Sequence, residues 1–121
     1  MATHNETGKI GENLAINWVI KAGYTVLHTN WRFSHYEVDI IASKLNKIHF
    51  IEVKTRRQTA YGWPEESISI SKLKTLMKAG AAFLELHPHW KEVQYDALSI
   101  NLYRNKEPEF LLIEDLYWME G

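Results

Sequence analysis

Two stretches decide the fold of this chain: Glu37-Val38-Asp39-Ile40-Ile41-Ala42 and Phe50-Ile51-Glu52-Val53-Lys54. Both read as strands, expected over 36–43 and 48–54, because they are rich in β-branched and aromatic residues. Burying their charged side chains is costly unless the charges are paired or bind a metal ion. The short polar segment Lys44-Leu45-Asn46-Lys47 between them predicts a hairpin turn. We therefore expect an antiparallel pair of strands that also carries the chemistry.

Strand register decides which charged side chains meet. A turn centred on Leu45–Asn46 would set Asp39 opposite Glu52, and Glu37 opposite Lys54. Directly opposed residues have Cβ atoms about 5 Å apart. Two carboxylates at that distance repel each other unless a cation lies between them. The register therefore predicts a divalent metal ion between Asp39 and Glu52.

Oxygen ligands of this kind suit Mg²⁺, with Mn²⁺ as the expected substitute. The predicted ligands are Asp39, Glu52 and the Val53 carbonyl. A metal ion there could activate water and stabilise charge on a phosphodiester, while Lys54 orients the attacking water or stabilises the pentavalent transition state. Glu12, on a predicted helix, could be a further ligand, but an acid in the first turns of a helix also suits the helix dipole. Both roles of Glu12 stay open.

The rest of the chain supplies helices and three more strands around this pair. Apolar residues at spacings of three and four predict a helix over 7–22 that ends at Gly23, and a second helix from a Ser71 cap to about His87. Strands are expected over 24–30, 93–103 and 109–113. The order helix, three strands, helix, two strands predicts an α/β fold, a mixed sheet flanked by helices, in a single domain over 1–121.

Composition excludes several classes of site. The 121 residues include no cysteine, which rules out disulfides, thiolate nucleophiles and thiolate zinc sites. With 45% hydrophobic and 24% charged residues, no long apolar run and a polar start, we expect a soluble cytoplasmic protein without membrane contact. The formal net charge of −1 means that nucleic acid would have to be met by a local basic patch.

These residues resemble the PD-(D/E)xK nucleases, which have the restriction-endonuclease-like fold and include Holliday-junction resolvases. Within that group the chain is similar to the YraN-like family, through Gly8-x-x-Gly11-Glu12-x-x-Ala15, Asn30-x-Arg32, Glu37-Val38-Asp39-Ile40-Ile41-Ala42, Phe50-Ile51-Glu52-Val53-Lys54-Thr55-Arg56, Tyr61-Gly62 and Lys72. The resemblance implies an αβββαββ fold, metal binding by Asp39 and Glu52, a catalytic Lys54 and a nucleic-acid substrate. Two positions depart from the pattern: Gln94 replaces an arginine, and Val38 replaces the proline of the motif.

Candidate nucleic-acid contacts lie along the same segments. Arg32, Arg56 and Lys72 could contact phosphates, whereas Lys74 and Lys78 are expected to be ordinary surface residues. Tyr61 could stack on unpaired bases or anchor its loop against the core.

Three readings of the charged strands follow. The first is a Mg²⁺-dependent endonuclease acting on DNA, with branched or irregular DNA as a candidate substrate. The second is a non-catalytic nucleic-acid-binding or assembly module that keeps the nuclease fold, and the third is a plain ion-pair cluster without metal. The aromatic tail 116–119 could cover the core or form a homodimer contact.

Overall fold

The computed structural model describes residues 4–58 and 69–116. Its elements follow one another as α1 (His4–Lys21), β1 (Thr25–Phe33), β2 (Tyr36–Lys44), β3 (Lys47–Gln58), α2 (Ile70–Leu86), β4 (Val93–Tyr103) and β5 (Glu109–Ile113). This order confirms the predicted αβββαββ arrangement. Tyr61 and the tail residues Tyr117–Met119 lie outside the described residues, so the roles expected for them stay predictions.

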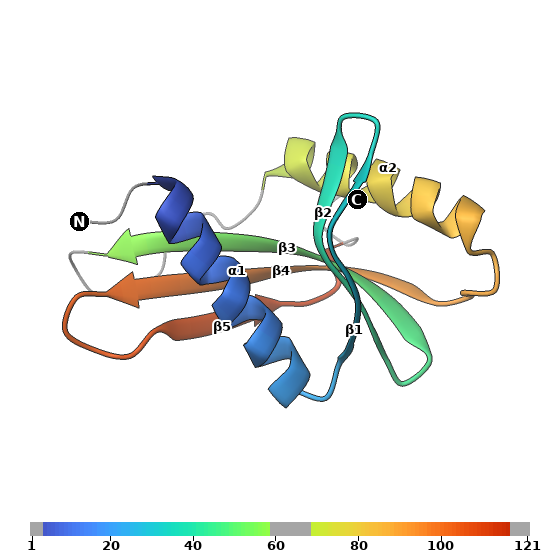
Figure 1. The fold of residues 1–121 in the computed structure, drawn as a ribbon. Helices are drawn as coiled ribbons and strands as arrows, with labels where there is room; N and C mark the ends of the chain where they lie inside the picture. The colour runs from blue at the N-terminus through green and yellow to red at the C-terminus, as the bar shows by residue number, and fades with distance from the viewer. Residues whose placement is uncertain (1–3, 59–68, 117–121) are drawn as a thin grey trace.

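The five strands form one mixed sheet in the order β1-β2-β3-β4-β5. The β3–β4 pair is parallel and the other three pairs are antiparallel. Helices α1 and α2 cover opposite faces of the sheet (Figure 1). The core is therefore double: Ala15 and Val19 of α1 pack against one face, and Leu73, Leu76 and Phe83 of α2 pack against the other. Neither helix in the described part of the chain is long and apolar enough to cross a bilayer.

The β2–β3 hairpin confirms the predicted turn. Leu45 and Asn46 have φ values of 53° and 64°, the positive values that a two-residue hairpin turn favours. Pairing runs from Lys44 opposite Lys47 to Ile40 opposite Ile51, in the predicted register.

The ladder ends at Ile40–Ile51, one pair before the predicted Asp39–Glu52 contact. The predicted oppositions of Asp39 to Glu52 and of Glu37 to Lys54 are therefore wrong as strand pairs. The reason is a change of direction in β2: Ile40 packs on the α1 side of the sheet, but Val38, which alternation should place beside it, packs on the α2 side. Beyond this point β2 stays paired with β1 only, and the two strands leave the sheet together (Figure 1).

Several element boundaries also differ from the predicted ones. Helix α1 begins at His4, before the predicted start at residue 7, and β1 continues to Phe33, past the predicted end at residue 30. Strand β3 continues past Lys54 to Gln58, because residues 55–58 pair with 100–103 of β4. The cap of α2 is Ser69, not Ser71: its backbone is extended, and its hydroxyl accepts a hydrogen bond from the Lys72 amide at 3.1 Å. A serine stands at both positions, so local sequence alone did not separate the two caps.

Candidate functional site

The candidate site lies where β2 separates from β3. There the amide of Val53 donates a hydrogen bond to Oδ2 of Asp39 at 2.7 Å. The β2–β3 ladder ends at Ile40–Ile51, so the Val53 N–H has no backbone partner in β2. The Asp39 carboxylate accepts its hydrogen bond instead. Because the N–H and C=O of one strand residue point to the same side, the Val53 carbonyl also faces the β2 side of β3.

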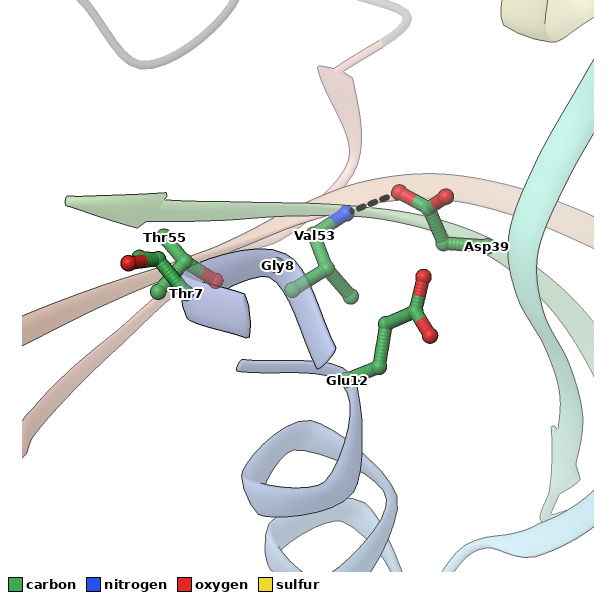
Figure 2. Close-up of a pocket in the computed structure, with 6 residues that line it drawn as sticks. All are labelled: Thr7, Gly8, Glu12, Asp39, Val53 and Thr55. Atoms are coloured by element: carbon green, nitrogen blue, oxygen red, sulfur yellow. Dashed lines mark hydrogen bonds between the residues drawn. The ribbon is translucent and has the colours of Figure 1, made fainter. Parts of the chain in front are cut away.

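A hollow opens beside this contact (Figure 2). It is lined by Thr7, Gly8 and Glu12 of α1, by Asp39, and by Val53 and Thr55 of β3. The Glu12 side chain points toward Asp39 and Val53 in this view. The volume is about 170 Å³, and since a water molecule occupies about 30 Å³ of the liquid, several waters fit.

Close packing of α1 on β3 brings Glu12 to this place. A Cβ atom added at Gly11 would lie 2.7 Å from the Cβ of Thr55, closer than real Cβ contacts allow. Only glycine therefore permits this approach without a shift of the helix or the strand. Gly11 precedes Glu12 directly, so the same contact fixes the height of Glu12 above the sheet.

Electrostatics make Asp39 the most perturbed acid among the groups with a resolved shift. The pKa of Asp39 is raised from 3.8 to about 7: burial is the largest cause, the negative charges of Glu52, Glu37 and Glu12 add to it, and the hydrogen bond from Val53 opposes the rise. The carboxylate form is thus disfavoured by its surroundings although one donor is in place. A cation in the hollow would reverse that balance.

Glu52 and Lys54 lie on the other face of β3. Phe50 packs with α2, and Glu52 and Lys54 follow it at the two-residue spacing of a strand face. Glu52 is 3.5 Å from the ammonium group of Lys72 on α2, with side-chain exposures of 17% and 58%. Within the described residues, no group of three or more acidic or histidine side chains converges as a metal cluster. Asp39 and Glu12 therefore share the hollow, whereas Glu52 acts on Asp39 through its charge.

The residues present fit a hard divalent cation on the α1 side. Mg²⁺ is usually bound by one or two carboxylates and keeps several waters. Asp39 and Glu12 offer two carboxylates with space for water, and the Val53 carbonyl lies at the same strand edge. This donor set could hold the ion without Glu52, although Glu52 was among the predicted ligands.

The predicted phosphate contacts are spread over several surfaces. Arg32 is 75% exposed and pairs with Glu37 across the β1–β2 ribbon at 2.9 Å. Arg56 is exposed near the far end of β3. Its neighbour Arg57, a further basic residue that could line a groove and contact phosphates, donates a hydrogen bond to the hydroxyl of Thr7 at 3.0 Å and so lies near the hollow.

Sequence reasoning missed the hydroxyl side of the hollow. Thr7 and Thr55 line it together with Gly8. The signal was present in Gly8-x-x-Gly11, whose three-residue spacing marks a bare helix face that can approach a strand. In the sequence these glycines indicated only the resemblance to the YraN-like family.

A second buried polar contact was also missed. His49 Nδ1 lies 2.8 Å from Asp96 Oδ2, and both side chains are buried. The other Asp96 oxygen accepts hydrogen bonds from the Gln94 side chain and the Asp115 amide, each at 2.9 Å. Burial, followed by the charges of Asp96 and Glu114, raises the pKa of nearby Tyr24 to about 12. Gln94, where the family pattern has arginine, thus helps to hold Asp96, which ties the segment after β5 to β4.

Comparison with known proteins finds one family that the chain resembles. Residues 11–100 match the profile of the uncharacterised protein family UPF0102. A UPF0102 protein of Bacteroides thetaiotaomicron is 40% identical over 100 residues, which cover 83% of each chain. UPF0102 proteins of Flavobacterium psychrophilum and Parabacteroides distasonis are each 36% identical over 118 and 120 residues, about the full length of both chains in each comparison.

Proposed function

The chain belongs to the uncharacterised protein family UPF0102, and we propose that it is a metal-dependent endonuclease that hydrolyses phosphodiester bonds in DNA. One observation carries the proposal: Asp39 is held beside Glu12 in a hollow where burial and neighbouring acids raise its pKa to about 7. Perturbed carboxyl groups in a hollow are typical of functional sites. We further propose that the protein acts in the cytoplasm and that branched or irregular DNA is its substrate.

Asp39 and Glu12 would hold Mg²⁺, or Mn²⁺ in its place, together with the Val53 carbonyl. A divalent ion at this place supplies Lewis-acid stabilisation of the charge that develops on a phosphodiester. Glu52 is available as a further acidic group, because its 3.5 Å contact to Lys72 exceeds the 2.7–2.9 Å of a strong charged hydrogen bond. That pair is partly exposed and weak, so a stronger cation can compete for Glu52.

Lys54 has the role of a positioning and charge-stabilising group. It is half-buried on the same strand face as Glu52, two residues further along β3. At the edge of β3 that β2 has left, where Asp39 contacts the neighbouring Val53, this ammonium group would orient the attacking water or stabilise the extra negative charge of the transition state. Arg56, Lys72 and Arg32 would contact phosphates and hold the DNA in register.

A cleavage panel tests the proposal. Labelled single-stranded, duplex, flapped and four-way-junction DNA are incubated with Mg²⁺ or Mn²⁺ and the native protein, Asp39→Asn or Lys54→Ala. We expect cutting that requires the metal and falls by at least about a hundredfold in either variant, since each removes a group that acts on the transition state. Glu107→Gln and Lys91→Ala, which change exposed charges elsewhere, are the matched controls and should cut normally.

Equal cutting by native protein and Asp39→Asn would trace the activity to a contaminant and overturn the proposal. A second function, a nucleic-acid-binding module without catalysis, is favoured by the position of Glu52 on the face of β3 opposite the hollow, which separates one expected ligand from Asp39 and Glu12. Specific binding of the same DNA panel with no metal-dependent cutting would establish that alternative.

A further inference from the structure

We infer that the outer face of α2 is a binding surface for the phosphate backbone of nucleic acid, an inference that rests on the proposed function. This face, called here the α2 ridge, consists of Ser71, Lys74, Thr75 and Lys78, which line a shallow hollow. All four are exposed, and their spacing of three and four residues places them on one side of the helix. The buried side of α2 faces the sheet, so the ridge points to solvent.

Charge is concentrated on this helix. Of its charged residues, three are lysines (Lys72, Lys74 and Lys78) and one is Glu85, a net charge of +2 in a chain whose formal net charge is −1. The rest of the chain is therefore acidic. A protein with a net negative charge needs a local basic patch to bind nucleic acid. The lysines of α2 form such a patch.

The charges of α2 are arranged against the stability of the helix itself. The N-terminal end of a helix dipole is positive and favours acids, whereas the C-terminal end favours bases. Helix α1 follows this rule, with Glu6 in its first turn and Lys21 in its last. Helix α2 has no acid in its first turn and no base in its last; Lys72 lies in the first turn, Lys74 follows it, and Lys78 lies at the middle of the helix.

Lys74 and Lys78 add a second unfavourable term. They are four residues apart on one face, where like charges repel. Among the described residues, no acid pairs with either lysine, in contrast to Lys72 and Lys106. A bound polyanion would offset both terms at once, because it supplies negative charge to the positive end and screens the two lysines from each other.

The dimensions fit a nucleic-acid strand. Four helical residues rise by about 6 Å, and one strand of duplex DNA carries a phosphate about every 3.4 Å along the axis. Lys74 and Lys78 can therefore contact separate phosphates, and the Ser71 hydroxyl at the N-terminal end of the ridge is a further donor. The Thr75 hydroxyl donates to the Ser71 carbonyl at 3.1 Å. The same helix carries Lys72 to Glu52, so a strand bound along α2 is tied to the element that borders the candidate site.

Binding measured in EDTA tests this surface without cleavage. A labelled DNA duplex is titrated with native protein, Lys74→Gln/Lys78→Gln and the matched control Lys21→Gln/Lys91→Gln, which removes two exposed lysines elsewhere. Between about 50 and about 200 mM salt, the ridge variant should lower the slope of log K against log salt by about two and weaken binding by about tenfold or more. The control should bind like native protein.

Stability gives an independent readout. Because the ridge lysines repel each other at a spacing of four residues, the ridge variant should have a melting temperature equal to or higher than that of native protein without DNA. Native-like DNA binding by the ridge variant would show that the α2 ridge is not a binding surface. If the native protein still cuts DNA, the proposed nuclease activity would remain supported. No duplex binding by native protein, or binding to heparin or phosphatidylserine vesicles in preference to DNA, would also overturn it.

Discussion

Asp39 receives opposing influences from its neighbours. The Val53 amide donates to its carboxylate and favours ionisation, whereas burial and three nearby glutamates favour the neutral acid. The raised pKa of about 7 shows that the second group of effects is larger. Ionised Asp39 therefore lowers the stability of the metal-free fold, which is the usual cost of a site prepared for a cation.

Substitution of Asp39 by Asn should reverse this cost in EDTA. The folded pKa is raised, so between about pH 4 and about pH 7 the folded protein binds more protons than the unfolded chain, and this group's contribution to stability declines as pH rises. A shift of this size corresponds to a few kcal/mol at most. Asp39→Asn keeps an acceptor for Val53 but cannot ionise. Urea unfolding should thus find it more stable than native protein at about pH 8 and nearly equal at about pH 4.

Glu107→Gln is the control for other titrating groups, since it changes an exposed carboxyl. Its stability difference from native protein should stay constant with pH. A constant difference for Asp39→Asn as well would mean that Asp39 ionises normally in the folded protein.

At the scale of the elements, two glycines of α1 should respond to alanine in opposite directions. A Cβ at Gly11 would collide with Thr55 of β3, whereas among the described residues no atom lies within 4 Å of a Cβ at Gly8. Gly8→Ala should therefore gain about 1 kcal/mol of stability from helix propensity. Gly11→Ala should lose about 1–3 kcal/mol through overpacking. Urea unfolding of both variants measures the difference.

A second substitution can test the contact between Gly11 of α1 and Thr55 of β3. Thr55→Gly removes the atoms that a Cβ at Gly11 would meet, so Gly11→Ala should cost less in that background than in native protein. An equal cost in both backgrounds would show that α1 does not touch β3 at this point.

Local signals predicted the elements well. Apolar spacing gave both helices, and the two-residue turn at Leu45–Asn46 gave the register of β2 and β3. What the sequence did not show was the end of that register, because it depends on Val38 packing on α2, a contact between distant segments. The extension of β3 to Gln58 depends likewise on parallel pairing with β4, some 45 residues further on.

The sequence predicted which residues belong to the site better than it predicted which of them lie together. Asp39, Val53 and Glu12 do lie together. Counting back along two straight strands placed Glu52 in the same group, but β2 turns away before that pair, and Glu52 contacts Lys72 instead. The hydroxyls of Thr7 and Thr55 line the hollow through the close approach of α1 to β3 at Gly11. The glycine spacing Gly8-x-x-Gly11 permits that approach, but it does not indicate which strand the helix meets.

At the scale of the whole molecule, the sheet separates two kinds of surface. The α1 side holds the acidic hollow with Asp39 and Glu12, and the α2 side carries Glu52, Lys54, Lys72 and the α2 ridge. The net charge of −1 is thus the sum of regions with opposite character. The α1 side is suited to a cation and the α2 side to a polyanion, and both border the edge of β3 where Asp39 contacts Val53.

Binding of Mn²⁺ should stabilise the whole fold through the hollow. A ligand at a hundred times its dissociation constant adds about 2.7 kcal/mol to the unfolding free energy, which for a chain of this size is a rise in melting temperature on the order of 10 °C. We expect that rise at about pH 8. The rise should be smaller at about pH 5, because Asp39 then holds a proton that the metal must displace.

Variants of the hollow locate the ion. Asp39→Asn and Glu12→Gln should each reduce the rise in melting temperature at pH 8, while Glu107→Gln should keep it. Equal rises in all four proteins would place the ion elsewhere, and no rise in native protein would favour the reading of these acids as a metal-free cluster.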